Sequence, residues 1–402
     1  MNVAPQRASV AGMIRPIHWL LLPGLALLSA FGQAQEEAPA TIARQSFDVT
    51  VPQAPTPVRM LGRAQLTYEI HLTNFSDSPL TVKRVRIVDP ADRIVADVAG
   101  EALERRLTRV SGPGRAVAPG YRSILFVETD LQPGNVPRSL RPVIDYKVAG
   151  DDRLFRTEAP WQEIRAASPV VLGPPLAGGP WAAVHDPSWQ RGHRRVFYTI
   201  DGRARLPGRY AIDFIKLDLQ GRTTTGDADR TGDAFGYGDD VLAVADGEIV
   251  GMRDDVAESP LISRNPAHPL GEGAGNYVAL RLRNGQVAFY EHLRPGNVRV
   301  RPGERVRQGQ VIGTLGFTGD TTGPHLHFHL ADANSLLGAE GVPFVFDRFT
   351  LLGRIDDMAQ FGKAPWHAPM DLTPERRREW PGFNTVLAFG TVESLKPRQT
   401  RR

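Results

Sequence analysis

Apolar and polar residues alternate over much of the first third of the chain. Residues 66–74 and 80–88 place apolar side chains at nearly every second position, with turn residues between the two segments. Side chains of a strand alternate between the two faces of a sheet, so this pattern predicts two half-buried strands. Residues 123–128 and 142–146 are predicted to be further strands. About a hundred residues of short alternating strands favour an immunoglobulin-like sandwich, assigned here to residues 35–165.

Strand patterns resume after a segment rich in proline, glycine and tryptophan at 166–192, which is predicted to be a linker. The dipeptide Asp201-Gly202 follows a strand-like segment and is typical of a two-residue hairpin loop. Later strand segments are predicted at 241–250, 277–282, 287–292 and 311–316. The chain is therefore predicted to be all-β, with a second, mostly antiparallel β-domain at 193–345. Residues 346–402 are predicted to be a tail that packs partly against this domain.

The N-terminal residues 1–34 have the pattern of a secretory signal peptide. Two arginines precede an apolar stretch at 19–31, and small residues follow it. The alternative is an uncleaved membrane anchor, but the apolar stretch contains Pro23 and is shorter than the ~20 residues of a spanning helix. The mature protein is therefore expected in the periplasm or outside the cell, without stable membrane insertion.

Composition limits the chemistry of the chain. It has no cysteine, which excludes disulfides, a lipidated cysteine anchor and thiolate metal ligands, so a metal must use His, Asp, Glu or Asn. The formal net charge is +4, and the expected loss of Arg7 and Arg15 with the signal peptide brings it closer to zero. No basic patch interleaved with aromatic residues is present, so no nucleic-acid partner is expected.

Histidines are concentrated after a glycine-rich turn near residue 320. His325, His327 and His329 alternate with Leu and Phe and therefore project from one face of a predicted strand. Two imidazoles at positions i and i+2 can bind a single zinc ion or divide ligation and proton transfer between them. The alternative is an exposed polar strand face that happens to use histidine.

Five segments in order resemble the lysostaphin-like zinc endopeptidases, also called LytM-domain proteins, which cut peptide cross-links in bacterial cell walls. The segments cover about a third of the chain: residues 237–250, 275–278, 290–293, 306–313 and 323–328. The resemblance implies a Zn²⁺ cofactor with His327 and Asp213 as ligands. It also implies that His292 and His325 are catalytic histidines. His329 matches no catalytic position of the family.

One position departs from the family. The family motif is His-x-x-x-Asp, and Arg209 stands at its first position. A guanidinium stays protonated and cannot bind zinc. If Asp201-Gly202 is a hairpin loop, residues whose numbers sum to 403 face each other, which places His193 opposite Tyr210. His193 is therefore the candidate for the missing metal ligand; the alternative is a residue at the start of a strand with no metal role.

One carboxylate and two imidazoles leave a coordination position of zinc open for water. The predicted function is an exported zinc endopeptidase that cuts peptidoglycan cross-links or another exported peptide. Arg209 keeps a second hypothesis open, a degenerate LytM domain that regulates another cell-wall hydrolase without catalysis. A third hypothesis, ranked last, is a wall-binding or carbohydrate-binding protein in which the sandwich does the work.

Overall fold

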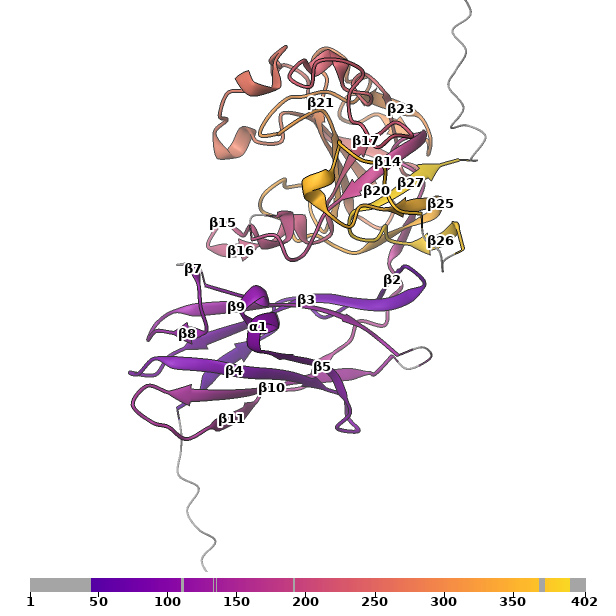
Figure 1. Ribbon diagram of the computed structural model, residues 1–402. Coiled ribbons are helices and arrows are strands. Elements are labelled where there is room, and N and C mark those ends of the chain that lie inside the picture. The colour runs from indigo at the N-terminus through magenta and orange to yellow at the C-terminus, as the bar shows by residue number, and fades with distance from the viewer. Residues whose placement is uncertain are drawn as a thin grey trace, which may run out of the picture. The chain divides into compact units, whose positions relative to one another are not determined.

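The computed structural model describes residues 45–390 except for 110–111, 133, 135, 191 and 369–372. The predicted signal peptide lies outside the described residues. Strands dominate the described chain, which confirms the predicted all-β class, and α1 (Gly100–Arg106) is a short helix beside the first strands (Figure 1). No helix within the described residues is both long enough and apolar enough to span a bilayer.

The N-terminal part contains two six-stranded sheets. The first sheet has the order β1 (Phe47–Thr50), β3 (Arg63–Asn74), β9 (Arg122–Asp130), β6 (Leu107–Arg109) and β7 (Gly112–Pro113), with β2 (Val58–Met60) paired to β3. The second has the order β11 (Phe155–Glu158), β10 (Ser139–Val148), β4 (Leu80–Val88) and β5 (Ile94–Ala99), with β12 (Gln162–Glu163) on β10 and β8 (Ala116–Val117) on β4. The immunoglobulin-like topology itself remains a prediction.

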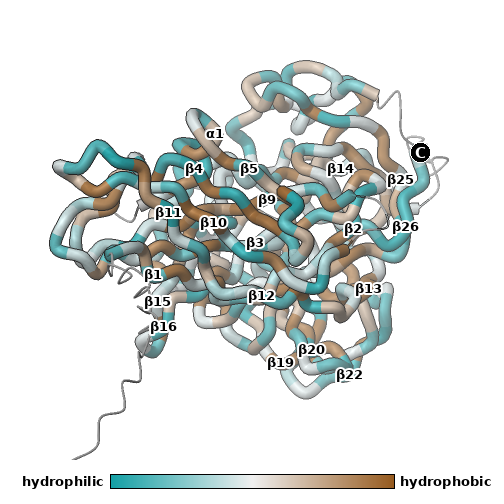
Figure 2. The backbone as a smooth tube through the Cα atoms, turned by 90° about the horizontal axis from the view of Figure 1, so that it is seen from below, coloured by the Kyte–Doolittle hydropathy of each residue, from teal (hydrophilic) through white to brown (hydrophobic). Residues whose placement is uncertain are grey.

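Both sheets contribute to one apolar core. Ile70 of β3 and Leu125 of β9 pack with Val85 of β4 and Ile144 of β10, and all four side chains are fully buried. The brown segments along these strands in Figure 2 show the apolar positions that supply this core. The alternating pattern predicted from the sequence therefore gives each sheet an apolar inner face.

The C-terminal part is built on an eleven-stranded sheet. Its order is β13 (Val170–Leu172), β25 (Phe344–Arg354), β27 (Thr385–Phe389), β14 (Gly178–Val184), β17 (Ile212–Lys216), β24 (Leu326–Ala331), β21 (Val287–Leu293), β20 (Asn276–Leu282), β19 (Gly247–Arg253) and β22 (Arg305–Val306), with β26 (Glu375–Glu379) paired to β25. The β13–β25 pair is parallel, and the other pairs of this sheet are antiparallel.

Smaller elements flank this sheet. Two pairs of strands form separate two-stranded sheets. One is the hairpin of β15 (Tyr198–Ile200) with β16 (Arg203–Arg205), and the other joins β18 (Asp240–Leu242) to the distant β23 (Val311–Thr314). Short 3₁₀ helices are η1 (His193–Arg195), η2 (Pro207–Tyr210), η3 (Thr231–Asp233), η4 (Ile262–Arg264), η5 (Leu270–Glu272) and η6 (Met358–Gln360).

The structure differs from the predicted boundaries on both sides of the second domain. The segment predicted as a linker contributes β13 and β14, and the segment predicted as a tail contributes most of β25 and all of β26 and β27. Trp181 in β14 is fully buried and belongs to the same core as Phe346 in β25 and Phe389 in β27. Two glycines and a proline hide β14 in the sequence, because such residues are ordinarily turn signals.

Candidate functional site

Three neighbouring strands bring the predicted site residues together. Asp213 of β17 lies directly opposite His327 of β24, and His327 lies opposite Glu291 of β21. Leu326 and Phe328, which flank His327, are fully buried in the core. The histidine side chains therefore project from the other face of the sheet, as the alternation of apolar and polar residues in this strand requires.

The carboxylate of Asp213 is the centre of the cluster. Its Oδ2 lies 2.8 Å from Nε2 of His193, and its Oδ1 lies 2.9 Å from Nδ1 of His327 and 3.3 Å from Nε2 of His325. Burial works to raise the pKa of Asp213, but the imidazoles of His193 and His325 outweigh it and hold this pKa well below its usual range. Burial likewise works to lower the pKa of these two histidines, and the carboxylate raises both. The cluster thus holds an ionised carboxylate within reach of three imidazoles.

The hairpin that carries His193 has the predicted register. Tyr198 pairs with Arg205 and Ile200 pairs with Arg203, so the facing numbers sum to 403. Beyond these strands both arms form 3₁₀ turns, η1 and η2, which pack against each other. Gly208 of η2 rather than Tyr210 lies against His193, since a Cβ built on Gly208 would be 2.7 Å from the carbonyl oxygen of His193. This contact places His193 beside Asp213.

The guanidinium of Arg209 is held by ion pairs and cannot serve as a metal ligand. It is buried, and its guanidinium donates to Glu69 Oε2 at 2.8 Å, to Glu340 Oε2 at 2.9 Å and to the carbonyl of Gly341 at 2.9 Å. The two carboxylates neutralise its charge, and they outweigh burial to raise its pKa. The residue at the family's ligand position is therefore a buried ion-pair partner, so its charge is compensated beside the histidine cluster.

His325 of the cluster and His292 beside it each have one ring nitrogen fixed by a backbone carbonyl. His292 Nδ1 lies 2.8 Å from the carbonyl oxygen of Thr318, and His325 Nδ1 lies 2.8 Å from that of Gly323. A carbonyl only accepts, so each Nδ1 carries the proton as donor. The His292 and His325 ring centroids are 4.7 Å apart. Burial, with the charges of neighbouring imidazoles, holds the pKa of His292 well below its usual range and keeps it neutral.

His329 and Glu291 extend the cluster on its buried side. His329 Nδ1 lies 3.2 Å from His327 Nε2 and 3.4 Å from Glu291 Oε1, and its ring stacks on Phe289. His329 is 2% exposed, so the alternative of an exposed polar strand face does not hold at this position. The sequence did not single out Glu291, although it lies beside His292. His71 of β3 also lies apart from the cluster, and its ring packs against Phe197.

The donor atoms fit a divalent metal that prefers nitrogen and oxygen. Among the described residues, His193, Asp213 and His327 offer ligand atoms within 4.8 Å of one another, as do two overlapping groups, His292–His325–His327 and Glu291–His327–His329. Two imidazoles and a carboxylate are a common zinc donor set.

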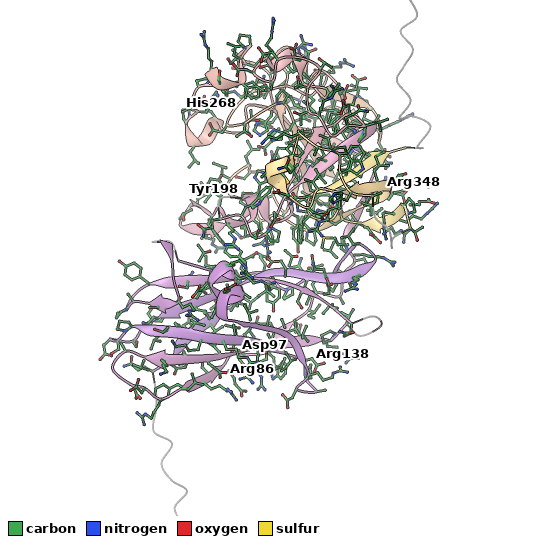
Figure 3. The ribbon with its side chains drawn as sticks, in the orientation of Figure 1. Arg86, Asp97, Arg138, Tyr198, His268 and Arg348 are labelled. Carbon is green, nitrogen blue, oxygen red and sulfur yellow. The ribbon has the colours of Figure 1, made fainter. Side chains whose placement is uncertain are left out.

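A cavity of about 170 Å³ opens beside His193, His292 and His327. Tyr198 of the hairpin and Leu270 of the 253–273 loop line it. Figure 3 shows Tyr198 and His268, a neighbour of Leu270 on that loop, on the same side of the domain. The cavity therefore borders the cluster, and the 253–273 loop forms part of its wall.

Comparisons with known proteins assign the class. Residues 233–337 match the model of Peptidase family M23, which confirms the resemblance to LytM-type proteins over this part of the chain. The matched residues include His292, His325 and His327, but they begin after His193 and Asp213. His193 and Asp213 lie outside the matched residues, and the contacts of Asp213 with His193 and His327 connect them to the matched histidines.

Two curated relatives come from Vibrio cholerae serotype O1. Peptidoglycan DD-endopeptidase ShyC is 56% identical over 54 residues, which are 13% of this chain and 12% of the relative. Peptidoglycan DD-endopeptidase ShyA is 43% identical over 70 residues, which are 17% of this chain and 15% of the relative. The chain thus aligns with only a small part of either protein. Among solved structures, the catalytic domain of lysostaphin from Staphylococcus simulans has 23% identity and a TM-score of 0.23, covering 41% of this chain and 88% of that domain.

Proposed function

We propose that this chain is an exported zinc metallo-endopeptidase that hydrolyses peptide cross-links of peptidoglycan. The observation that carries the proposal is the position of Asp213, within hydrogen-bonding distance of both His193 and His327. The family of residues 233–337 and the names of the two Vibrio relatives support peptidoglycan as the substrate. The apolar N-terminal segment supports export.

Asp213, His327 and His193 are the proposed ligands of Zn²⁺. The zinc ion, when bound, supplies a Lewis acid that polarises the scissile carbonyl and makes a water molecule more acidic. Asp213 brings one negative charge to the site, so a divalent ion held by it and neutral imidazoles retains net positive charge. Such a site favours the negative charge that develops on the carbonyl oxygen during amide hydrolysis.

His292 and His325 are the proposed catalytic histidines. Since Nδ1 of each donates to a backbone carbonyl, Nε2 is the atom left to exchange a proton with the reacting groups. Neutral His292 accepts a proton at Nε2 from the attacking water. His325, protonated at both ring nitrogens, donates a hydrogen bond from Nε2 to the developing oxyanion. The backbone of His292, near the end of β21, has a φ of 64°, which a non-glycine residue rarely adopts. This conformation sets the direction of the His292 side chain.

The second candidate function is a non-catalytic regulator of a cell-wall hydrolase. Arg209 favoured it in the sequence, because a permanent positive charge at a ligand position would repel zinc. In the structure Arg209 pairs with Glu69 and Glu340, and His193 lies where it can bind a metal with Asp213. These contacts support the enzyme over the regulator.

The experiment is zinc analysis of purified residues 35–402, combined with hydrolysis of purified peptidoglycan followed by the release of soluble fragments. The parent is expected to bind zinc near stoichiometry and to lose activity in chelator. His193→Ala and His327→Ala are expected to lose both zinc and activity. His367→Ala is the control, because the His367 side chain is exposed and pairs with Asp356, away from the histidine cluster.

Each other outcome has a defined meaning. Zinc lost only in His327→Ala leaves the enzyme but removes His193 from the ligand set. A parent that fails to bind zinc after reloading, or binds it without cutting peptidoglycan, refutes the endopeptidase and favours the regulator.

A further inference from the structure

The face of β3 that points away from the sandwich core is polar and yet buried. Leu66, Tyr68, Ile70 and Leu72 fill the sandwich core, and the alternate residues belong to the opposite face. On that face Thr67, Glu69, His71 and Thr73 are each no more than 5% exposed. An outer sheet face with this composition is ordinarily solvated, so another part of the chain must cover it.

The segment 193–210, which carries His193, provides this cover. Glu69 accepts from Arg209 Nε at 2.8 Å with one oxygen and from Arg194 at 3.5 Å with the other. Tyr210 donates from its hydroxyl to the carbonyl of Thr67 at 3.1 Å. Glu69 therefore joins both 3₁₀ turns of the hairpin to a single strand of the sandwich.

Arg194 is the immediate neighbour of His193 and is anchored in the sandwich. It donates to the carbonyls of Tyr68 at 3.1 Å and Val127 at 3.0 Å, and it forms an ion pair with Glu128. It is 7% exposed, and burial lowers its pKa to about 10, so it remains charged near neutral pH. The backbone of His193 thus adjoins a side chain fixed to β3 and β9.

An apolar contact completes the same surface. Phe197 packs against Ile124 and Phe126 of β9 and against Leu206 of the hairpin, and its ring meets that of His71 at a centroid distance of 5.8 Å. Removing the sandwich would expose these rings and would leave Arg194 and Arg209 without the carboxylate that they share. Within the described residues, β15 and β16 pair with each other and with no other strand. Without the sandwich, the hairpin would keep its contacts to Glu340 and Gly341, which come from Arg205, Leu206 and Arg209.

We propose that Glu69 is a positioning residue for the metal centre and that the sandwich domain is a structural part of that centre. The proposal rests on the proposed function, because it takes His193 as a zinc ligand. The residue at the family's ligand position, Arg209, anchors the hairpin to the sandwich through Glu69, and the ligand is supplied by His193 on the facing turn. The sandwich holds the two turns together so that His193 stays beside Asp213.

The test compares Glu69→Gln with Asp145→Asn in the full mature chain. Glutamine keeps the shape of Glu69 but removes the negative charge that Glu69 supplies to the guanidiniums of Arg194 and Arg209. Asp145 is the matched control: it is a buried carboxylate of the sandwich that also pairs with two arginines, Arg86 at 3.0 Å and Arg156 at 2.7 Å. It lies on β10 in the other sheet, and Figure 3 shows Arg86 on that sheet.

The readout is the zinc dissociation constant from competition with a chromogenic chelator, together with Tm and with kcat and KM at saturating zinc. Glu69→Gln is expected to weaken zinc binding by about 10- to 100-fold, the loss typical of residues that orient metal ligands. Saturating zinc is expected to restore most of kcat. Asp145→Asn is expected to lower Tm while zinc affinity stays within about twofold of the parent.

Two results overturn the proposal while the parent still binds zinc and cuts peptidoglycan. One is a Glu69→Gln protein with zinc affinity within twofold of the parent. The other is an equal loss of affinity in both variants, which indicates general destabilisation. If Glu69→Gln does not fold, Phe197→Leu loosens the same surface without leaving a buried charge, and the same two criteria apply to it. A parent that neither binds zinc nor cuts peptidoglycan refutes the proposed function instead.

Discussion

Gly208 forms the closest contact between the two 3₁₀ turns that place His193. A Cβ added there would lie 2.7 Å from the carbonyl oxygen of His193 and 2.8 Å from its Cβ, whereas ordinary contacts begin at 3.4 Å. Gly208→Ala must therefore separate the turns by about 0.7 Å at the closest pair. The nearest atom belongs to the backbone and cannot rotate aside, so the strain falls on the position of His193.

A displacement of this size is large for a metal ligand. Ligand distances in metal sites stay within about 0.2 Å of their ordinary values. We therefore expect Gly208→Ala to weaken zinc binding by about 10- to 100-fold, as disturbed ligand orientation does. Overpacking of a well-packed contact costs about 1–3 kcal/mol of unfolding free energy, so Tm should also fall.

Chelator competition and urea unfolding of Gly208→Ala measure both effects. The control is Gly232→Ala, because a Cβ at Gly232 meets no atom within 4 Å and the residue also lies in a 3₁₀ turn. The control should match the parent in zinc affinity. A Gly208→Ala protein that binds zinc as tightly as the parent would show that His193 is no ligand, or that the turns yield without moving it.

Three further predictions concern stability. Burial lowers the pKa of His185 from 6.5 to about 4, so the folded state binds fewer protons than the unfolded state. The free energy of unfolding should therefore fall as pH drops below about 6.5, by up to about 3 kcal/mol near pH 4. His185→Gln should flatten this decline in urea unfolding, and an unchanged pH profile would contradict the prediction. Trp181→Ala removes a fully buried side chain and should cost about 3–5 kcal/mol in the same assay, a loss below 1 kcal/mol being inconsistent with its burial. The side-chain amide of Asn276 accepts from the backbone N–H of Val256 and donates to its carbonyl, each at 2.9 Å. Asn276→Ala should therefore speed proteolytic cleavage within residues 253–273, and an unaltered cleavage rate would refute this prediction.

The local pattern of residues was sufficient to predict structure that depends on neighbours close in the chain. The alternation in 66–74 and 80–88 predicted β3 and β4, and the Asp201-Gly202 dipeptide predicted the hairpin together with its register. The position of His193 was predicted only to within a few residues. Pro207 has no N–H to donate, so the second arm of the hairpin leaves the strand conformation there and Gly208, instead of Tyr210, meets His193.

Contacts between residues far apart in the chain left no recognisable pattern in the sequence. Glu69 is 140 residues from Arg209, and nothing around either residue indicates the other. The strands β13 and β14 were missed for a related reason. β13 has only three residues, and β14 contains two glycines and a proline. Their pairing partners, β25 for β13 and β27 and β17 for β14, lie farther along the chain. The resemblance to the LytM-type family implied His292, His325, His327 and Asp213 as a group, but the role of Arg209 required the three-dimensional contacts.

The position of β27 has a consequence for the order in which the chain can assemble. β14 lies between β27 and β17, and β17 carries Asp213, so the strand beside Asp213 is flanked by the last strand of the described chain. Until residues 385–389 are available, β14 presents an unpaired edge, and pairing over such a separation in sequence is slow. We therefore expect the part of the sheet that carries Asp213 to close only after residues 385–389 have been synthesised.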